Sequence, residues 1–103
     1  MISLTSQNFA DIVAEGAVLV DFWADVCAPC RALIPVLEAL DRDVPELTIG
    51  KVDIQKERDL ALSWGVNALP TLVFFVNGVE KTRMTGLHTR EQIVEILERA
   101  SRL

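Results

Sequence analysis

The chain has 103 residues, which is room for one domain over residues 1–103 with one hydrophobic core, but not for two. Fifteen acidic residues outnumber ten basic ones, and the net charge of −5 disfavours nucleic acid or an anionic membrane as the main partner, because both would repel the protein. Two cysteines and one histidine exclude a disulfide-rich scaffold, a four-cysteine zinc site and a zinc site of two cysteines and two histidines within one chain.

The first half of the chain predicts strands and helices in alternation. A short strand at residues 2–4 is followed by a helix that Thr5 or Ser6 can cap. The apolar run Ala17–Trp23 predicts a buried strand that leads through a turn into a second helix, which Pro35 is expected to kink because it has no N–H to donate. Apolar residues recur at helical spacing in both helices: Phe9, Ile12 and Val13 in the first, and Leu33, Val36, Leu37 and Leu40 in the second.

The second half predicts a strand, a short helix, a hairpin and a last helix. Asn77-Gly78 is typical of a two-residue hairpin turn, so the segments on either side of it are expected to pair as antiparallel strands. Thr89, followed three residues later by Gln92, predicts a capping box at the start of the last helix. The expected strands are Leu47–Ile54, Thr71–Val76 and Val79–Thr85, the short helix is Lys56–Trp64, and the last helix buries Ile93, Ile96, Leu97 and Ala100.

This order of elements predicts an α/β fold. Parallel crossovers in the first half and an antiparallel hairpin in the second combine into a mixed central sheet of about five strands. The four α-helices are expected to flank the sheet on both faces.

The chain shows no signal for a membrane or for export. No apolar run approaches the roughly 18 residues that a spanning helix needs. The N-terminal segment lacks the basic start and continuous apolar stretch of a signal peptide. We therefore expect a cytoplasmic protein with no membrane partner.

The most informative segment is the junction between the strand Ala17–Trp23 and the helix that follows it. Cys27 and Cys30 are three positions apart and can close a small disulfide ring, which stabilises the fold little but suits a reversible switch. Backbone N–H groups and the dipole at the helix N-terminus favour a thiolate at Cys27, the expected nucleophile. Cys30, one turn on, is placed to resolve a mixed disulfide, and Pro29 fits the first helical turn.

Two other interpretations of the cysteine pair remain open. The pair can be half of a zinc site completed by dimerisation, or two incidental buried cysteines. A C-x-x-C motif beside a β-α-β pattern favours the redox pair.

Six motifs, in order along essentially the whole chain, resemble the thioredoxin family. They are Val18–Ala24, Cys27-Ala28-Pro29-Cys30, Lys51-Val52-Asp53, Leu69-Pro70-Thr71, Asn77-Gly78 and Gly86. The resemblance implies the thioredoxin fold and a protein disulfide reductase that works by dithiol–disulfide exchange through the two cysteines. Such a protein is a redox carrier rather than a conventional enzyme.

The resemblance also implies roles for residues around the pair. Asp21 lies in an otherwise apolar strand, where burial would raise the pKa of its carboxyl group. In the family such a residue accepts the proton of the second cysteine, here Cys30, and Lys51 would lie beside it on the neighbouring strand. A strand-edge aspartate that faces water and a solvated lysine are the alternative interpretations.

A client-binding rim is implied in the same way. The family's cis-proline loop corresponds to Leu69 and Pro70, whose cis bond would present backbone to an extended peptide. The residues expected to contact clients are Trp23, Val26, Pro29, Ile54, Ala68, Leu69, Pro70, Gly86 and Leu87.

The sequence departs from the family pattern at two positions. Val26 stands where the family usually has Trp, and Ala28 where it usually has Gly. Val26 therefore supports an alternative, a specialised thioredoxin-like protein with few clients. A redox-inactive interaction module is a second alternative.

The resemblance finally implies partners. No bound cofactor is expected, and electrons would come from NADPH through a flavin-dependent thioredoxin reductase. Disulfide-containing client proteins would be the substrates, and the protein would act as a monomer.

Overall fold

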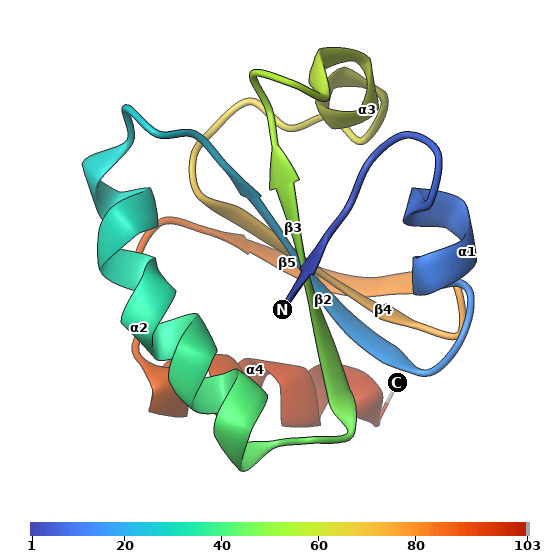
Figure 1. Cartoon of the computed structure of the whole chain (residues 1–103). Helices are drawn as coiled ribbons and strands as arrows, with labels where there is room; N and C mark the ends of the chain where they lie inside the picture. Colours follow the sequence, from blue (N-terminus) through green and yellow to red (C-terminus); the bar gives the residue numbers. More distant parts are fainter. Residues whose placement is uncertain (103) are drawn as a thin grey trace.

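A five-stranded mixed sheet forms the centre of the computed structural model, which describes residues 1–102 (Figure 1). The strand order is β1-β3-β2-β4-β5, with β1, β3 and β2 parallel and β4 and β5 antiparallel to their neighbours. The elements are β1 Ile2–Ser3, α1 Phe9–Val13, β2 Ala17–Trp23, α2 Ala28–Asp43, β3 Leu47–Asp53, α3 Arg58–Ser63, β4 Thr71–Val76, β5 Val79–Thr85 and α4 Arg90–Ser101. The predicted order of elements and the mixed sheet of five strands are confirmed.

Two helices begin later than the sequence predicts. A turn precedes α1, in which the Thr5 hydroxyl oxygen accepts the Gln7 backbone N–H at 3.2 Å, so neither Thr5 nor Ser6 directly caps the helix. The residues between β3 and α3 also form a turn, because the Asp53 carbonyl oxygen accepts the backbone N–H groups of Lys56 and Glu57. The helix predicted from Lys56 is therefore shorter, Arg58–Ser63.

The last helix begins as predicted. The Thr89 hydroxyl oxygen accepts the Gln92 backbone N–H at 3.1 Å, and the Gln92 side-chain oxygen accepts the Thr89 backbone N–H at 2.9 Å, which confirms the capping box. The α2 helix continues past Pro35 to Asp43. Within residues 1–102, none of the helices has both the length and the apolar character needed to cross a membrane.

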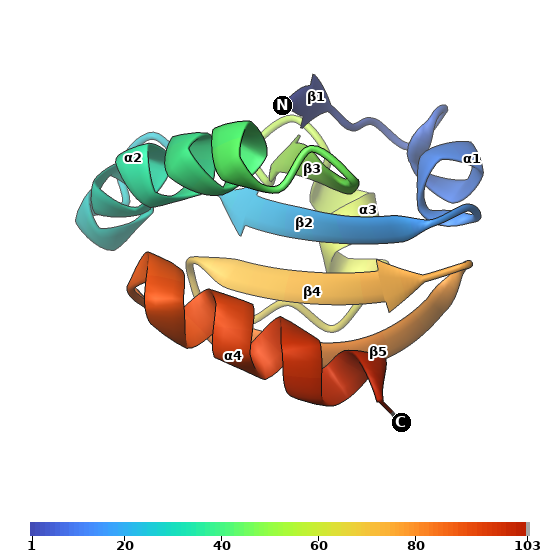
Figure 2. The ribbon, with the colours of Figure 1, turned by 90° about the horizontal axis from the view of Figure 1, so that it is seen from below.

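The alternation of side chains along β2 divides the core into two halves. Leu19 packs with residues of α2 and α4 on one face of the sheet, where Figure 2 shows both helices. Val18, Val20 and Phe22 pack with residues of α1 and α3 on the other face. Because side chains two positions apart on a strand point the same way, Asp21 lies on the face of Leu19, under α2.

Gly50 of β3 packs tightly against Leu4, which follows β1. A Cβ atom on Gly50 would overlap the side chain of Leu4, which is only 1% exposed. We expect Gly50→Ala to lower the free energy of unfolding by about 1–3 kcal/mol, measured by urea denaturation, because the extra atom overpacks the core.

A double-mutant cycle isolates the cause of this effect. In a Leu4→Ala background the space is open, so Gly50→Ala should cost much less there than in the wild type. An equal cost in both backgrounds would contradict the steric explanation.

Candidate functional site

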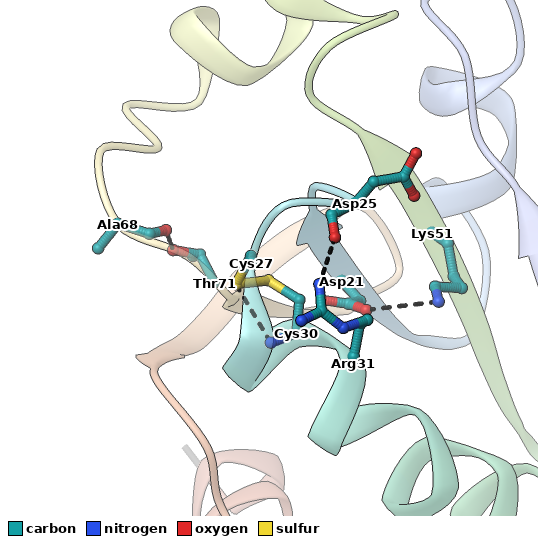
Figure 3. Close-up of a disulfide and its surroundings, with 8 residues drawn as sticks. All are labelled: Asp21, Asp25, Cys27, Cys30, Arg31, Lys51, Ala68 and Thr71. Atoms are coloured by element: carbon teal, nitrogen blue, oxygen red, sulfur yellow. Dashed lines mark hydrogen bonds and ion pairs between the residues drawn. A yellow bond between two sulfur atoms is a disulfide. The ribbon is translucent and has the colours of Figure 1, made fainter.

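The cysteine pair lies at the N-terminus of α2, directly after the turn that follows β2. Cys27 and Cys30 are joined by a disulfide, with their Cα atoms 5.2 Å apart. Cys27 is the N-cap residue, and its sulfur atom accepts the Cys30 backbone N–H at 3.1 Å (Figure 3). That N–H is one of the donors that a helix leaves unpaired at its start, so a negative charge on the Cys27 sulfur is favoured by this donor and by the helix dipole.

The two sulfur-bearing residues differ in their access to solvent. Cys27 is half-buried, whereas Cys30 is 3% exposed. The neighbouring Val26 is 82% exposed. A large reaction partner can therefore approach the pair from the side of Cys27.

Asp21 is buried on the face of β2 that α2 covers, without compensating hydrogen bonds. Its side chain is 0% exposed, and among residues 1–102 no donor reaches either carboxyl oxygen. Burial raises the pKa of Asp21 from its usual 3.8 to about 6, while the positive charge of Lys51 partly lowers it. The interpretation of Asp21 as a strand-edge residue facing water is therefore wrong.

Lys51 is the cation closest to that carboxyl group. Asp21 and Lys51 are register partners in the parallel pair β2–β3, and the Lys51 ammonium nitrogen lies 4.0 Å from an Asp21 oxygen (Figure 3). The same nitrogen sits 4.9 Å from the centre of the Trp23 ring. The predicted proximity of Lys51 to Asp21 is confirmed. The contact with the Trp23 ring helps to hold the Lys51 ammonium group in this position.

The loop before β4 carries the cis bond that the resemblance implies, between Leu69 and Pro70. The Thr71 hydroxyl donates to the Ala68 carbonyl oxygen at 2.6 Å, and Figure 3 shows these two residues beside the disulfide. The Gly86 backbone N–H donates to the Pro70 carbonyl oxygen at 2.9 Å. The end of this loop is thus held in place by Thr71, the first residue of β4, and by Gly86, the residue after β5.

The start of the same loop is held by a pair that sequence reasoning missed. Arg83 donates to the Trp64 carbonyl oxygen at 2.9 Å and forms two hydrogen bonds of 2.7 Å with the Glu80 carboxylate. In a regular strand, residues three apart point to opposite faces. A register shift in β5 pairs Glu80 with Phe75 and Thr82 with Phe74, which brings Glu80 and Arg83 onto one face. No feature of the sequence predicts that register shift.

The other predicted client-binding residues gather at the same end of the sheet. Their exposure differs: Val26, Pro29, Ala68 and Leu87 are exposed, Trp23, Ile54, Leu69 and Gly86 are half-buried, and Pro70 is buried. Ile54 and Leu69 also pack against the core on the side of α1 and α3. Their apolar character therefore serves the core as well as the surface.

Comparisons with known proteins agree with this geometry. The thioredoxin family model matches residues 1–99. A thioredoxin from Chlamydia muridarum is 44% identical over 100 residues, which cover 96% of this chain and 98% of that protein. A thioredoxin from Bacillus subtilis is 34% identical over 100 residues, 96% of each chain.

Solved structures show the same fold. A mutant thioredoxin from Halobacterium salinarum superposes with a TM-score of 0.90 at 30% identity, covering 99% of this chain and 91% of that one. A thioredoxin from Fasciola hepatica gives a TM-score of 0.86 at 31% identity, over 97% of this chain and 99% of that one. The chain therefore belongs to the thioredoxin family, and its Cys27–Cys30 disulfide occupies the position of that family's redox-active pair.

Proposed function

We propose that Cys27 is the attacking residue and Cys30 the resolving residue in the reduction of client disulfides. The Cys27 thiolate attacks one sulfur of a client disulfide, and the other client sulfur leaves as a thiolate. Cys30 then attacks the Cys27 sulfur, which releases the second client thiolate and leaves the Cys27–Cys30 disulfide. The observation that carries this assignment is the asymmetry of the pair: Cys27 caps the helix at the accessible end, while Cys30 is 3% exposed.

Asp21 accepts the Cys30 proton in this scheme. A thiol must lose its proton before it attacks, and Cys30 is screened from bulk water. Asp21 lies on the face of β2 that α2 covers, and a pKa of about 6 keeps its carboxylate mostly ionised at neutral pH while retaining useful affinity for a proton. Lys51 stabilises the carboxylate between turnovers.

The client backbone docks along the cis-proline loop. The Leu69–Pro70 bond and the hydrogen bonds of Thr71 and Gly86 hold this loop beside the disulfide. An extended client segment that pairs with the loop backbone would present its disulfide to Cys27, with Trp23, Val26, Pro29, Ile54, Ala68 and Leu87 as further contacts.

The oxidised protein is returned to the dithiol form by a reductase. Membership of the family implies such a partner as well as disulfide-containing clients. In the proposal this partner is a flavin-dependent thioredoxin reductase that draws on NADPH, and the chain itself binds no cofactor. The protein acts as a monomer in the reducing cytoplasm.

Insulin reduction tests the proposal. The wild-type protein with dithiothreitol should precipitate the insulin B chain faster than dithiothreitol alone, and Cys27→Ser should reduce the rate to that of the reagent. A wild-type rate equal to that of dithiothreitol alone would support the redox-inactive interaction module instead.

A specialised protein with few clients remains the second candidate, because the exposed residue before Cys27 is Val26, 82% exposed, where the family usually has a tryptophan. We expect Val26→Trp to raise kcat/KM for insulin several-fold, since an aromatic side chain offers more contact area than Val. Val26→Ala serves as the control for loss of the existing contact. Equal kcat/KM values for all three proteins would mean that Val26 does not limit client recognition.

A further inference from the structure

A second concave surface lies beside the cis-proline loop. This groove, of about 510 Å³, is formed by the two residues after β3, by residues of α3 and by Val66 in the loop between α3 and β4. It is lined by Ile54, Gln55, Arg58, Ala61, Leu62 and Val66, and it is called the α3 groove below.

The sheet topology brings the α3 groove to the cysteine pair. β2 leads into Cys27 and lies between β3 and β4 in the sheet. Because β3 is parallel to β2 and β4 is antiparallel, the end of β3 and the start of β4 meet at the end of β2. Ile54 is tied to this point by its backbone N–H, which donates to the Trp23 carbonyl oxygen at 3.0 Å. Figure 1 shows α3 and the loop before β4 gathered at this end of the sheet.

The groove has an apolar floor and one charged wall. Leu62 is 69% exposed although it is a large hydrophobic residue, and Ile54 and Val66 are half-buried. Arg58 is the single charged residue among the six described residues that line the groove. Its guanidinium group makes no ion pair with any carboxylate of residues 1–102.

Of the acidic residues near Arg58 in the chain, two accept hydrogen bonds from backbone N–H groups. The Glu57 carboxylate accepts the Ser6 backbone N–H at 2.7 Å, and an Asp53 oxygen accepts the Gln55 backbone N–H at 2.9 Å. Asp59 is exposed beside Arg58 in the chain but does not line the groove. In a protein of net charge −5, an unpaired arginine beside the exposed Leu62 side chain would attract a partner that carries a carboxylate.

We propose that the α3 groove binds the client segment next to the reacting cysteine and favours segments that carry an apolar side chain and a carboxylate. This inference rests on the proposed function and adds a substrate preference to it. The apolar side chain would cover Leu62 and Val66, and the carboxylate would pair with Arg58. Continuity with the cis-proline loop would let one extended client segment occupy both surfaces.

The test uses symmetrical peptide disulfides that differ in one residue. Each peptide has one cysteine, one leucine and, three to six residues from the cysteine on either side, Glu, Gln or Lys. The rate at which the reduced protein is oxidised is followed by acid quenching and chromatography. We expect the best Glu peptide to react about threefold faster than its Lys counterpart, the size expected for an exposed charge pair.

Charge reversal makes the test specific. Arg58→Glu should invert the preference, so that the Lys peptide reacts faster than the Glu peptide, while Leu62→Ser should slow both. Arg102→Glu makes the same charge change at the end of α4, far from α3 in Figure 1, and should keep the wild-type preference.

The outcomes separate the two proposals. If the wild-type protein reduces none of the peptides, the proposed function itself fails. If it reduces them all but Arg58→Glu leaves the ratio of Glu to Lys rates unchanged, the reductase stands and the α3 groove is not a client site.

Discussion

Cys30→Ser should turn the protein from a reductase into a trap for its clients. Attack by Cys27 is retained, because the N–H that its sulfur accepts belongs to the backbone of residue 30 and survives the substitution. Resolution is lost, because serine cannot displace the client thiol from Cys27. Insulin turnover should fall to the rate of dithiothreitol alone, and mixed disulfides through Cys27 should accumulate.

Capture from a cell lysate measures this effect. Immobilised Cys30→Ser protein should retain clients that are released only by a reductant, and mass spectrometry should locate the bond at Cys27. The double variant Cys27→Ser/Cys30→Ser is the matched control and should retain nothing covalently. Stronger capture by the Cys27→Ser single variant than by Cys30→Ser would reverse the assignment of attacking and resolving residues.

Removing the Asp21 carboxyl group should stabilise the fold at neutral pH. The folded protein holds the Asp21 proton more tightly than the unfolded chain, because the pKa rises from 3.8 to about 6. The stability that this tighter proton binding provides is fully present below pH 3.8, is lost as pH rises to about 6, and changes no further above that value. A shift of this size corresponds to about 3 kcal/mol.

The pH dependence separates this effect from the cavity left by a smaller side chain. The difference in unfolding free energy between Asp21→Ala and wild type should shift in favour of the variant by roughly 2–3 kcal/mol from about pH 4 to pH 7.5. The cavity lowers stability at every pH and cancels from this comparison. Asp21→Asn, which keeps the shape without the charge, should follow the same pH dependence in urea denaturation.

Catalysis should respond in the opposite direction. Without Asp21 the Cys30 proton has no buried acceptor, so the resolving step should slow by about 10²-fold, the lower end for a positioned general base. Lys51→Met should raise the pKa of Asp21 further, because the positive charge of Lys51 lowers that pKa, and should extend the upper end of the pH window above about 6. Asp21→Ala protein with full activity and an unchanged pH dependence of stability would show that the carboxyl group has neither role.

Much of the molecule follows from short-range features of the sequence. The Asn77-Gly78 turn has Asn77 at φ 49° and Gly78 at φ 84°, backbone values that these two residue types tolerate. The Thr89–Gln92 capping box starts α4 as predicted. The position of Cys27 at a helix start follows from the spacing of the pair and from Pro29, since both act within one helical turn.

Contacts between distant segments could not be predicted from the residues alone. Apolar residues lie on both sides of β2, so periodicity along the strand does not say which face Asp21 occupies. Its burial under α2 and its distance of 4.0 Å from Lys51 depend on the parallel register that pairs the two residues. The family resemblance implied this neighbour, whereas propensity and spacing did not.

The sequence by itself determined the order of the elements, the helix and hairpin signals and the placement of the cysteine pair, because these depend on residues a few positions apart. Only the tertiary structure decided the environment of Asp21, the shift in β5 that joins Glu80 to Arg83, and the α3 groove with its unpaired Arg58. The environment of Asp21 depends on the pairing of β2 with β3, which are far apart in the chain, and the shift in β5 depends on how β5 pairs with β4 within the hairpin. The register of the strands and the packing of the helices decide which side chains are buried and which are paired. Neither the register nor the packing is encoded within a single segment of the sequence.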